Sequence, residues 1–516
     1  MTALVLLAIL ALVLLGARLF VVVGVGTMLC FALLVDGGSD VEQLVRIVNK
    51  MESLTTKNVF LSSPLFVTAG TVMTRGGMAG RLITVVRGVI GRVSGGLAIA
   101  AVISSMFFAA ISGSSPVTLV AVGTILYPAL VESKFPRGPS MGLLMTAGSL
   151  GCLLPPSIAM LIYAICVPGK AGVDPSDLFI AGGIPAFVIA GVLCVYAWVI
   201  GRRHPESLAH DVRVSGQLWS EFKAAGFALA LPLIVIGGIY TGQFTPTEAG
   251  AVALGYSVIV CVFVHRELSW QGLYDAFAES AVLVGSLILI VVLAFGLNDF
   301  LAEIEAAERM GDWLRNADLS PLMFFVIVNV ALIFIGALMD SVSATLVFAP
   351  LLAPIALDVY GISPIHFGVV FVVNMEIGYL MPPVATNLFV GSAIFKRPFG
   401  EVAKAVMPTL GIVVGALMLL ILVPTLSTGP LNVRDGKPFY TPFPWNGPEA
   451  VVVPSAPDSA TTPPGTLPPT TPHAKPMTME EMMKATQGAG AAPPAVKKPM
   501  TMEEMMNATK QPPQTP

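Results

Sequence analysis

The chain reads GCLLPPS from Gly151 to Ser157 and GYLMPPV from Gly378 to Val384. Both stretches lie within long apolar runs that have the composition of membrane helices. A Pro-Pro pair removes two backbone donors and places two rings against the preceding turn, so each pair predicts a break in a helix. The sequence therefore predicts two broken helices whose glycines lie 227 residues apart.

The composition indicates the class of protein. Of the 516 residues, 55% are hydrophobic and 11% are charged, whereas soluble domains carry about 25% charged residues. Apolar runs recur as far as about residue 427, and their length of about 17 to 25 residues is sufficient to cross a lipid bilayer. We expect an all-α polytopic membrane protein. Neither a GxxxxGKS/T phosphate loop nor HExxH occurs, so we expect no enzyme activity. We also expect no nucleic-acid partner.

A polar stretch repeats with the same spacing. When the chain is shifted by 227 residues without gaps, SGSSPVTLV (112–120) falls on MDSVSATLV (339–347). The shift also superposes hydroxyl residues and prolines: Ser114 on Ser341, Thr118 on Thr345, and Pro155-Pro156 on Pro382-Pro383. We infer a duplicated unit, as in many secondary transporters.

Each polar stretch interrupts an apolar segment, 94–131 or 320–357, and predicts two short helices forming a re-entrant hairpin. The first hairpin is flanked by basic residues: Arg75, Arg81, Arg87, Arg92, Lys134 and Arg137. The second is flanked mainly by acidic residues: Asp299, Glu303, Glu305, Glu308, Asp312, Asp318 and Asp358. Because basic loops stay cytoplasmic, the hairpins enter from opposite sides. The predicted fold therefore has inverted structural repeats with two re-entrant hairpins and two broken helices.

The polar turns are the candidate cation sites. They contain hydroxyl, carboxyl and glycine residues: Ser112, Gly113, Ser114 and Ser115 in one, and Asp340, Ser341, Ser343 and Thr345 in the other. Irregular backbone at membrane depth requires protein or a watery cavity around it, and oxygen clusters suit a hard cation such as Na⁺. A single membrane serine most often bonds its own helix, but the repetition in register favours a site. Asp340 strengthens this interpretation, because intramembrane acids are usually functional.

The quoted residues resemble a known family. LFVTAG, GGLA (95–98), FFAAISGSS, GCLLPPS, HFG (366–368) and NMEIGYLMPPVATNLFV are similar to the large membrane subunit of TRAP transporters, the tripartite ATP-independent periplasmic transporters of bacteria. The resemblance covers roughly residues 1–427. It implies an elevator-type permease of the ion-transporter superfamily, multi-pass in the bacterial inner membrane, that imports an organic acid such as a dicarboxylate by symport. It also implies Na⁺ as the coupling ion with no other cofactor, and two partners: a small four-helix membrane subunit and a periplasmic substrate-binding protein.

The resemblance also extends the candidate sites. Carried across residue by residue, it adds positions at the breaks to the cation sites: Gly151 and Pro155 in the first, and Gly378, Pro382 and Thr386 in the second. The candidates for contact with the organic acid are Ser115, Thr118, Pro156, Asn374, Glu376 and Asn387. Glu376 has an alternative role as a buried carboxyl that packs its helix. Where the family usually reads TPPVG, this chain has Met381-Pro-Pro-Val-Ala385, which narrows the space at the second break.

We expect six parts along the chain. They are scaffold helices and an arm (1–93), the first hairpin and broken helix of the transport domain (94–166), further scaffold helices and a second arm (167–319), the second hairpin and broken helix (320–396), a last membrane helix (397–427), and a disordered tail rich in proline and methionine (428–516). The tail carries TMEEMM twice, and its composition is that of disordered segments.

Two alternatives to a tripartite permease stay open from the sequence. One is a stand-alone Na⁺/carboxylate symporter of the same superfamily. The other is a non-transporting membrane assembly subunit. For the tail, the two TMEEMM copies suggest docking of a partner helix, and the methionine clusters suggest a Cu(I) site.

Overall fold

The computed structural model describes residues 19–34, 59–90, 93–167, 169–205, 217–339, 341–382 and 385–444. Within these ranges the regular structure is entirely helical. Seven of the described helices are long and apolar enough to cross a membrane. The prediction of an all-helical, multi-span protein is therefore confirmed. Asp340, Pro383 and both TMEEMM copies lie outside the described residues.

Each predicted hairpin is a pair of helices joined by a short turn. The first consists of α6 (Gly96–Ser112) and α7 (Ser115–Glu132), and the second of α15 (Pro321–Leu338) and α16 (Ser341–Asp358). Helix α6 ends because Gly113 has φ of 60° and its N–H bonds the Ala109 carbonyl. Glycine adopts this left-handed conformation with little strain. Pro116 in the first turn of α7 suits a helix start, where its missing N–H costs no helical hydrogen bond.

The two Pro-Pro pairs break helices as predicted. In the first repeat, α8 (Arg137–Ser149) continues as the short η1 (Leu150–Cys152), and the chain becomes helical again in α9 (Ile158–Cys166). The side chain of Ser157 caps α9 by accepting the N–H of Met160 at 3.2 Å. In the second repeat, α17 (Pro364–Leu380) ends before the prolines and α18 (Thr386–Phe395) follows them.

The helix bounds follow the 227-residue shift well beyond the hairpins. Helix α8 begins at Arg137 and α17 at Pro364, which are residues that the shift superposes. The same shift places α5 (Met78–Ile90) on α14 (Ala306–Asn316) and α10 (Pro175–Arg203) on α19 (Phe399–Leu422). The duplication therefore extends from the amphipathic arm before each hairpin to the long helix after each broken helix.

The two repeats interlock through reciprocal helix contacts. Each hairpin packs on its own broken helix, since α6 and α7 contact α8 while α15 and α16 contact α17. The second half of each broken helix instead packs on the other hairpin: α18 lies against α7, and α9 lies against α16. This exchange brings the two breaks and the two hairpin turns into one helical core.

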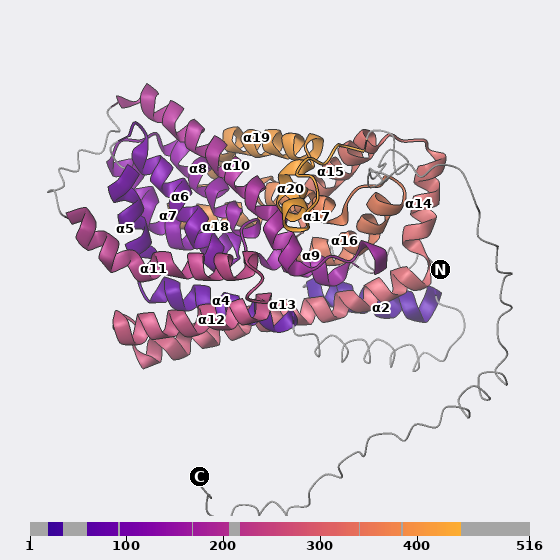
Figure 1. Ribbon diagram of the computed structural model, residues 1–516, viewed down its shortest axis with the longest axis horizontal. Coiled ribbons are helices and arrows are strands. Elements are labelled where there is room, and N and C mark those ends of the chain that lie inside the picture. The colour runs from indigo at the N-terminus through magenta and orange to yellow at the C-terminus, as the bar shows by residue number, and fades with distance from the viewer. Residues whose placement is uncertain are drawn as a thin grey trace, which may run out of the picture. The chain divides into compact units, whose positions relative to one another are not determined.

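The remaining helices lie beside this core. They are α2 (Leu19–Leu34), α4 (Val59–Arg75), α11 (Gln217–Tyr240), α12 (Pro246–Val258) with its π-helical continuation η4 (Ile259–Val264), and α13 (Trp270–Glu303). Figure 1 shows α2, α4, α12 and the long α13 side by side beneath the repeats, consistent with their mutual packing. Arg75 at the end of α4 bonds Glu279 of α13 at 2.8 Å, which joins these two helices.

Two parts of the structure differ from the sequence-based division. Helix α10 was expected in the scaffold but packs against α6, α9, α17 and α19, and so lies with the repeats. The fold also continues beyond residue 427, because α20 (Thr425–Arg434) and the chain to residue 444 cover α10 and α17. Phe443 is only 6% exposed and packs against the Phe325 ring, while Arg434 bonds Asp177 of α10 at 2.6 Å. Composition marks this segment as tail, but these contacts bury it.

Candidate functional site

The first tip, defined as residues 112–115 between α6 and α7, is a closed hydroxyl cluster. The Ser112 and Thr118 hydroxyls lie 2.7 Å apart, and Thr118 donates to the Ser114 carbonyl at 2.9 Å. The Ser112 hydroxyl also reaches the Ser114 carbonyl at 3.3 Å, so either hydroxyl can be the donor in the contact between them, and in both cases the two hydrogens bond within the cluster. Ser112, Ser115 and Thr118 are buried, whereas Ser114 is partly exposed. The hydroxyl hydrogens of Ser112 and Thr118 therefore bond within the cluster. The remaining lone pairs of the two hydroxyl oxygens are available to another ligand.

The first break lies directly against this tip. A Cβ on Gly151 would stand 3.0 Å from the Ser114 carbonyl group, so the two backbones meet as closely as a glycine allows. The Gly113 carbonyl accepts the N–H of Ile158 at 3.4 Å, which joins the turn to the first residue of α9. The Pro156 carbonyl lies on the other side of Gly113. Gly151 and Pro156 thus lie against the tip, and buried Pro155 lies within the same break.

The second tip is the turn between α15 and α16, of which Met339 and Ser341 are described. Thr345 donates to the Ser341 carbonyl at 2.6 Å, which repeats the Thr118–Ser114 bond at the positions superposed by the shift. The amide and the hydroxyl of Ser341 both lie 3.0 Å from the Tyr379 hydroxyl oxygen. Ser341, Ser343 and Thr345 are at most 3% exposed. Asp340 lies outside the described residues.

The second break meets its hairpin differently from the first. Gly378 contacts Gly336 within α15, so it holds α17 against the hairpin helix rather than against the turn. Beyond Pro382, Ala385 donates its N–H to the Ala337 carbonyl at 3.4 Å, as Ile158 does to Gly113 in the first repeat. Ala385 has φ of 43°, a left-handed conformation that costs a non-glycine residue about 1–2 kcal/mol. The alanine is therefore accommodated, with strain, at the start of α18. The side chain of Thr386 lies outside the described residues.

One side-chain bond connects the two repeats at the first tip. The Asn387 amide on α18 donates to the Ser115 hydroxyl at 2.6 Å, and both residues are fully buried. The carbonyl oxygen of the same amide has no hydrogen-bond partner among the described residues. The first tip is thus assembled from α6, α7, the first break and the second repeat's α18.

Comparison with known proteins identifies the family. The family model described as "Tripartite ATP-independent periplasmic transporter, DctM component" matches residues 4–426. The chain belongs to the DctM family. It is therefore a multi-pass permease of a bacterial transporter rather than an enzyme, as the sequence predicted.

Individual relatives agree with this assignment. The C4-dicarboxylate TRAP transporter large permease protein DctM of Rhodobacter capsulatus is 38% identical over 379 residues, which are 71% of this chain and 85% of that protein. The 2,3-diketo-L-gulonate TRAP transporter large permease protein YiaN of Escherichia coli (strain K12) is 30% identical over 421 residues, or 80% of this chain and 96% of that protein. The solved structure of the Alcanivorax borkumensis YdaH transporter shares the fold, with a TM-score of 0.55 at 16% identity over 82% of this chain and 98% of that chain.

Two of the predicted substrate contacts of the permease are placed in helix packing. Asn374 donates to Asn329 of α15 and to the Val370 carbonyl, so it stabilises the α15–α17 contact. Glu376 is 1% exposed and lies next to Ser149 and Cys152 of the first broken helix. Its carboxylate oxygens have no hydrogen-bond partner by geometry among the described residues. Asn374 thus joins α15 to α17, whereas Glu376 is a buried carboxyl between α17 and the first broken helix.

Sequence reasoning missed two polar residues of the permease that contact the tips or the breaks. Ser157 caps α9 beside the first tip, and its position between Pro-Pro and an apolar run is a recognisable helix-start signal. Tyr379 contacts the second tip from the last turn of α17. The shift superposes Tyr379 on Cys152, so the register provides no signal that could have found it.

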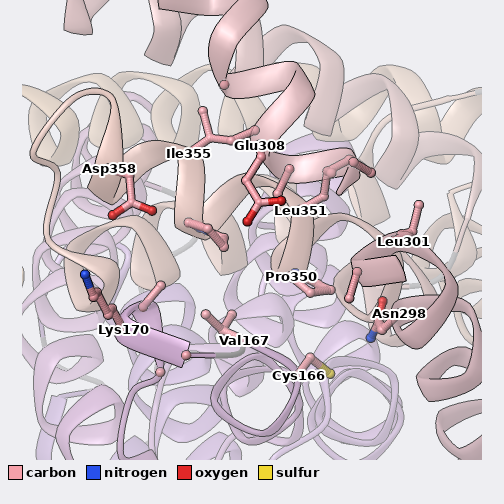
Figure 2. Close-up of a pocket in the computed structure, with 18 of the residues that line it drawn as sticks. Cys166, Val167, Lys170, Asn298, Leu301, Glu308, Pro350, Leu351, Ile355 and Asp358 are labelled. Carbon is pink, nitrogen blue, oxygen red and sulfur yellow. The ribbon is translucent and has the colours of Figure 1, made fainter. Parts of the chain in front are cut away.

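A cavity of about 1220 Å³ lies between the repeats and the second arm of the permease, bounded by α9, α13, α14 and α16. Figure 2 shows Glu308 and Asp358 on one side of it, with Asn298 and Cys166 on the other. Its charged lining residues are mainly acidic: Asp174, Asp299, Glu305, Glu308, Asp312 and Asp358, against Lys170 and Arg315. Such a lining attracts cations rather than organic anions. None of the tip hydroxyl residues lines it, but α16 runs from the cavity to the second tip.

Proposed function

We propose that this permease imports an organic acid by symport with Na⁺ and that each hairpin tip, with the break beside it, holds one cation. The observation that carries the proposal is the repeated hydroxyl-to-carbonyl bond, Thr118 to Ser114 and Thr345 to Ser341, at register-matched positions of the two tips. Equivalent local chemistry in both repeats favours equivalent sites over incidental serine packing.

The hydrogen-bond pattern supports a cation as the ligand. At both tips the threonine hydrogen is donated to a carbonyl inside the cluster, and the lone pairs of the hydroxyl oxygens remain. Hydroxyl and carbonyl oxygens in irregular backbone are ligands that suit a hard monovalent cation. Asp340 would add a negative charge at the second site, and the proposed cation ligands also include Gly151, Pro155, Gly378, Pro382 and Thr386.

The organic acid is proposed to lie between the two tips. The relatives named above are described for a C4-dicarboxylate and for 2,3-diketo-L-gulonate, which are both carboxylates. Helices α9 and α18 begin beside the tips, and helix N-termini favour negative charge. Two bound cations and two helix N-termini would together hold a carboxylate. Ser115, Thr118, Pro156 and Asn387 are the proposed contacts because they surround the first tip.

The packing supports an elevator motion of one group of helices against another. The interlocked helices α6–α10 and α15–α19 form the proposed transport domain, and α2, α4, α12 and α13 form the proposed scaffold. The opposite loop charges support inverted repeats. The family description names a tripartite system, so we propose a small four-helix membrane subunit and a periplasmic binding protein as partners in the bacterial inner membrane.

Uptake into proteoliposomes tests the proposed coupling. The permease is reconstituted with its small subunit and binding protein, and entry of radiolabelled succinate or 2,3-diketo-L-gulonate is followed under an inward Na⁺ gradient. Two Na⁺ ions moving down a tenfold gradient release about 2.8 kcal/mol, which supports about hundredfold accumulation of the organic acid when there is no membrane potential. We expect uptake only with the gradient. Equal uptake with K⁺ replacing Na⁺ on both sides would contradict Na⁺ coupling, and equal uptake without the binding protein would favour a stand-alone symporter.

A further inference from the structure

Tyr379 is the one residue of α17 whose described hydrogen bonds reach the second tip. Tyr379 lies in the last turn of α17, three residues after Glu376. It is 8% exposed, and its hydroxyl oxygen faces Ser341. The amide nitrogen and the side-chain oxygen of Ser341 each lie 3.0 Å from that oxygen, and both act as donors to it. One phenol oxygen thus accepts the first N–H of α16 and the hydroxyl hydrogen of the same residue.

This arrangement fixes the direction of the Ser341 hydroxyl. Because its hydrogen points to Tyr379, the lone pairs of the Ser341 oxygen point away from the phenol. Thr345 donates to the Ser341 carbonyl at 2.6 Å and orients a second oxygen in the same way. The exposed amide hydrogen at the start of a helix would repel a cation, and Tyr379 accepts that hydrogen as well.

At the first tip, the corresponding amide and hydroxyl hydrogens are bonded by residues of the hairpin itself. There the N–H of Ser114 lies 3.4 Å from the Ser112 hydroxyl oxygen, and the Ser112 and Thr118 hydroxyls bond each other. The residue that the shift superposes on Tyr379 is Cys152, whose side chain lies beside the Ser115 backbone. The polar groups of Ser112 and Ser114 are thus bonded within the first hairpin, whereas Ser341 of the second tip is bonded by a side chain of α17.

We propose that Tyr379 is the positioning residue of the second cation site. It holds Ser341 in the orientation that offers oxygen lone pairs to the cation, and it does not itself touch the cation. The proposal rests on the proposed function, because it requires that the second tip bind Na⁺. The Na⁺ affinity of the second site then depends on the last turn of α17, and the Na⁺ affinity of the first site does not.

The test compares Tyr379→Phe with Tyr163→Phe in the full chain. Tyr163 is a matched control because it is fully buried and its hydroxyl donates to the Pro364 carbonyl at 2.9 Å, away from both tips. Binding of ²²Na⁺ to the purified chain is measured as a function of Na⁺ concentration. We expect Tyr379→Phe to weaken one of the two sites by about tenfold, as for loss of one hydrogen bond to an ordered ligand, and to leave the other site unchanged. Tyr163→Phe should bind as the wild type does.

A double-mutant cycle separates positioning from general packing. If Tyr379 acts through Ser341, then Tyr379→Phe weakens Na⁺ binding less in a Ser341→Ala background than in the wild type, because only the bond to the residue 341 amide is left to lose. Independent effects of the two substitutions, or wild-type affinity of both sites in Tyr379→Phe, would overturn the proposal while leaving Na⁺ coupling intact. A wild-type chain that binds no Na⁺ would overturn the proposed function and this inference together. Circular dichroism of each variant confirms that binding is measured on folded protein.

Discussion

Replacing Gly113 with alanine is expected to reduce Na⁺-driven uptake by at least about tenfold. Gly113 ends α6 with φ of 60°, where any side chain costs about 1–2 kcal/mol. A Cβ there would also overlap the Pro156 carbonyl, which belongs to the first break. Since neither backbone can yield without separating the tip from α9, the first cation site is lost. Initial uptake rates in proteoliposomes measure the effect.

The control for this substitution is Gly138→Ala in the first turn of α8. A Cβ at Gly138 meets no atom within 4 Å, so the same chemical change creates no overlap. Gly138→Ala should transport at the wild-type rate and be at least as stable, because alanine favours helix. If Gly113→Ala also transports at the wild-type rate, the first turn and first break do not form one site.

Replacing Asn387 with alanine is expected to uncouple the second repeat from the first tip. The Asn387 amide is the donor to the buried Ser115 hydroxyl at 2.6 Å. Removing it leaves a buried oxygen without this partner and destabilises the fold by about 1–3 kcal/mol. Because Ser115 begins α7 at the proposed substrate position, uptake should fall more than stability alone explains. Uptake and thermal unfolding in detergent are measured on the same preparation.

Asn432→Ala provides the matched comparison. Its amide donates to the Thr441 hydroxyl at 2.8 Å in the segment after α20, away from both tips. This variant loses a similar bond and should keep wild-type uptake. Equal uptake in Asn387→Ala and Asn432→Ala would show that the bond between the repeats is structural only.

Local sequence signals were sufficient to predict the tips and the breaks. Hydroxyl residues at a shared register, such as Thr118 and Thr345, predict the same bond in both repeats because each threonine reaches the carbonyl four residues earlier. The Pro-Pro pairs likewise act on the turn that contains them. These features need no knowledge of how distant helices pack.

Local sequence signals could not predict the contacts between the repeats. The shift superposes Asn387 on Met160 and Tyr379 on Cys152, so neither polar side chain has a counterpart that would reveal its role. Both depend on the exchange in which α18 packs on α7, and on how α17 meets the second tip. Phe443 was missed for a related reason, because the proline-rich sequence around it carries no signal for the distant Phe325 ring that buries it.

The number of Na⁺ ions bound by the purified permease tests the central claim most directly. The measurement is equilibrium ²²Na⁺ binding to the wild type, to Thr118→Val and to Thr345→Val, which remove register-matched hydroxyls from the two tips. The account predicts about two Na⁺ per wild-type chain, not displaced by equal K⁺, and about one in each variant, because each tip offers one cluster of oxygen ligands. Unchanged stoichiometry in both variants would contradict it.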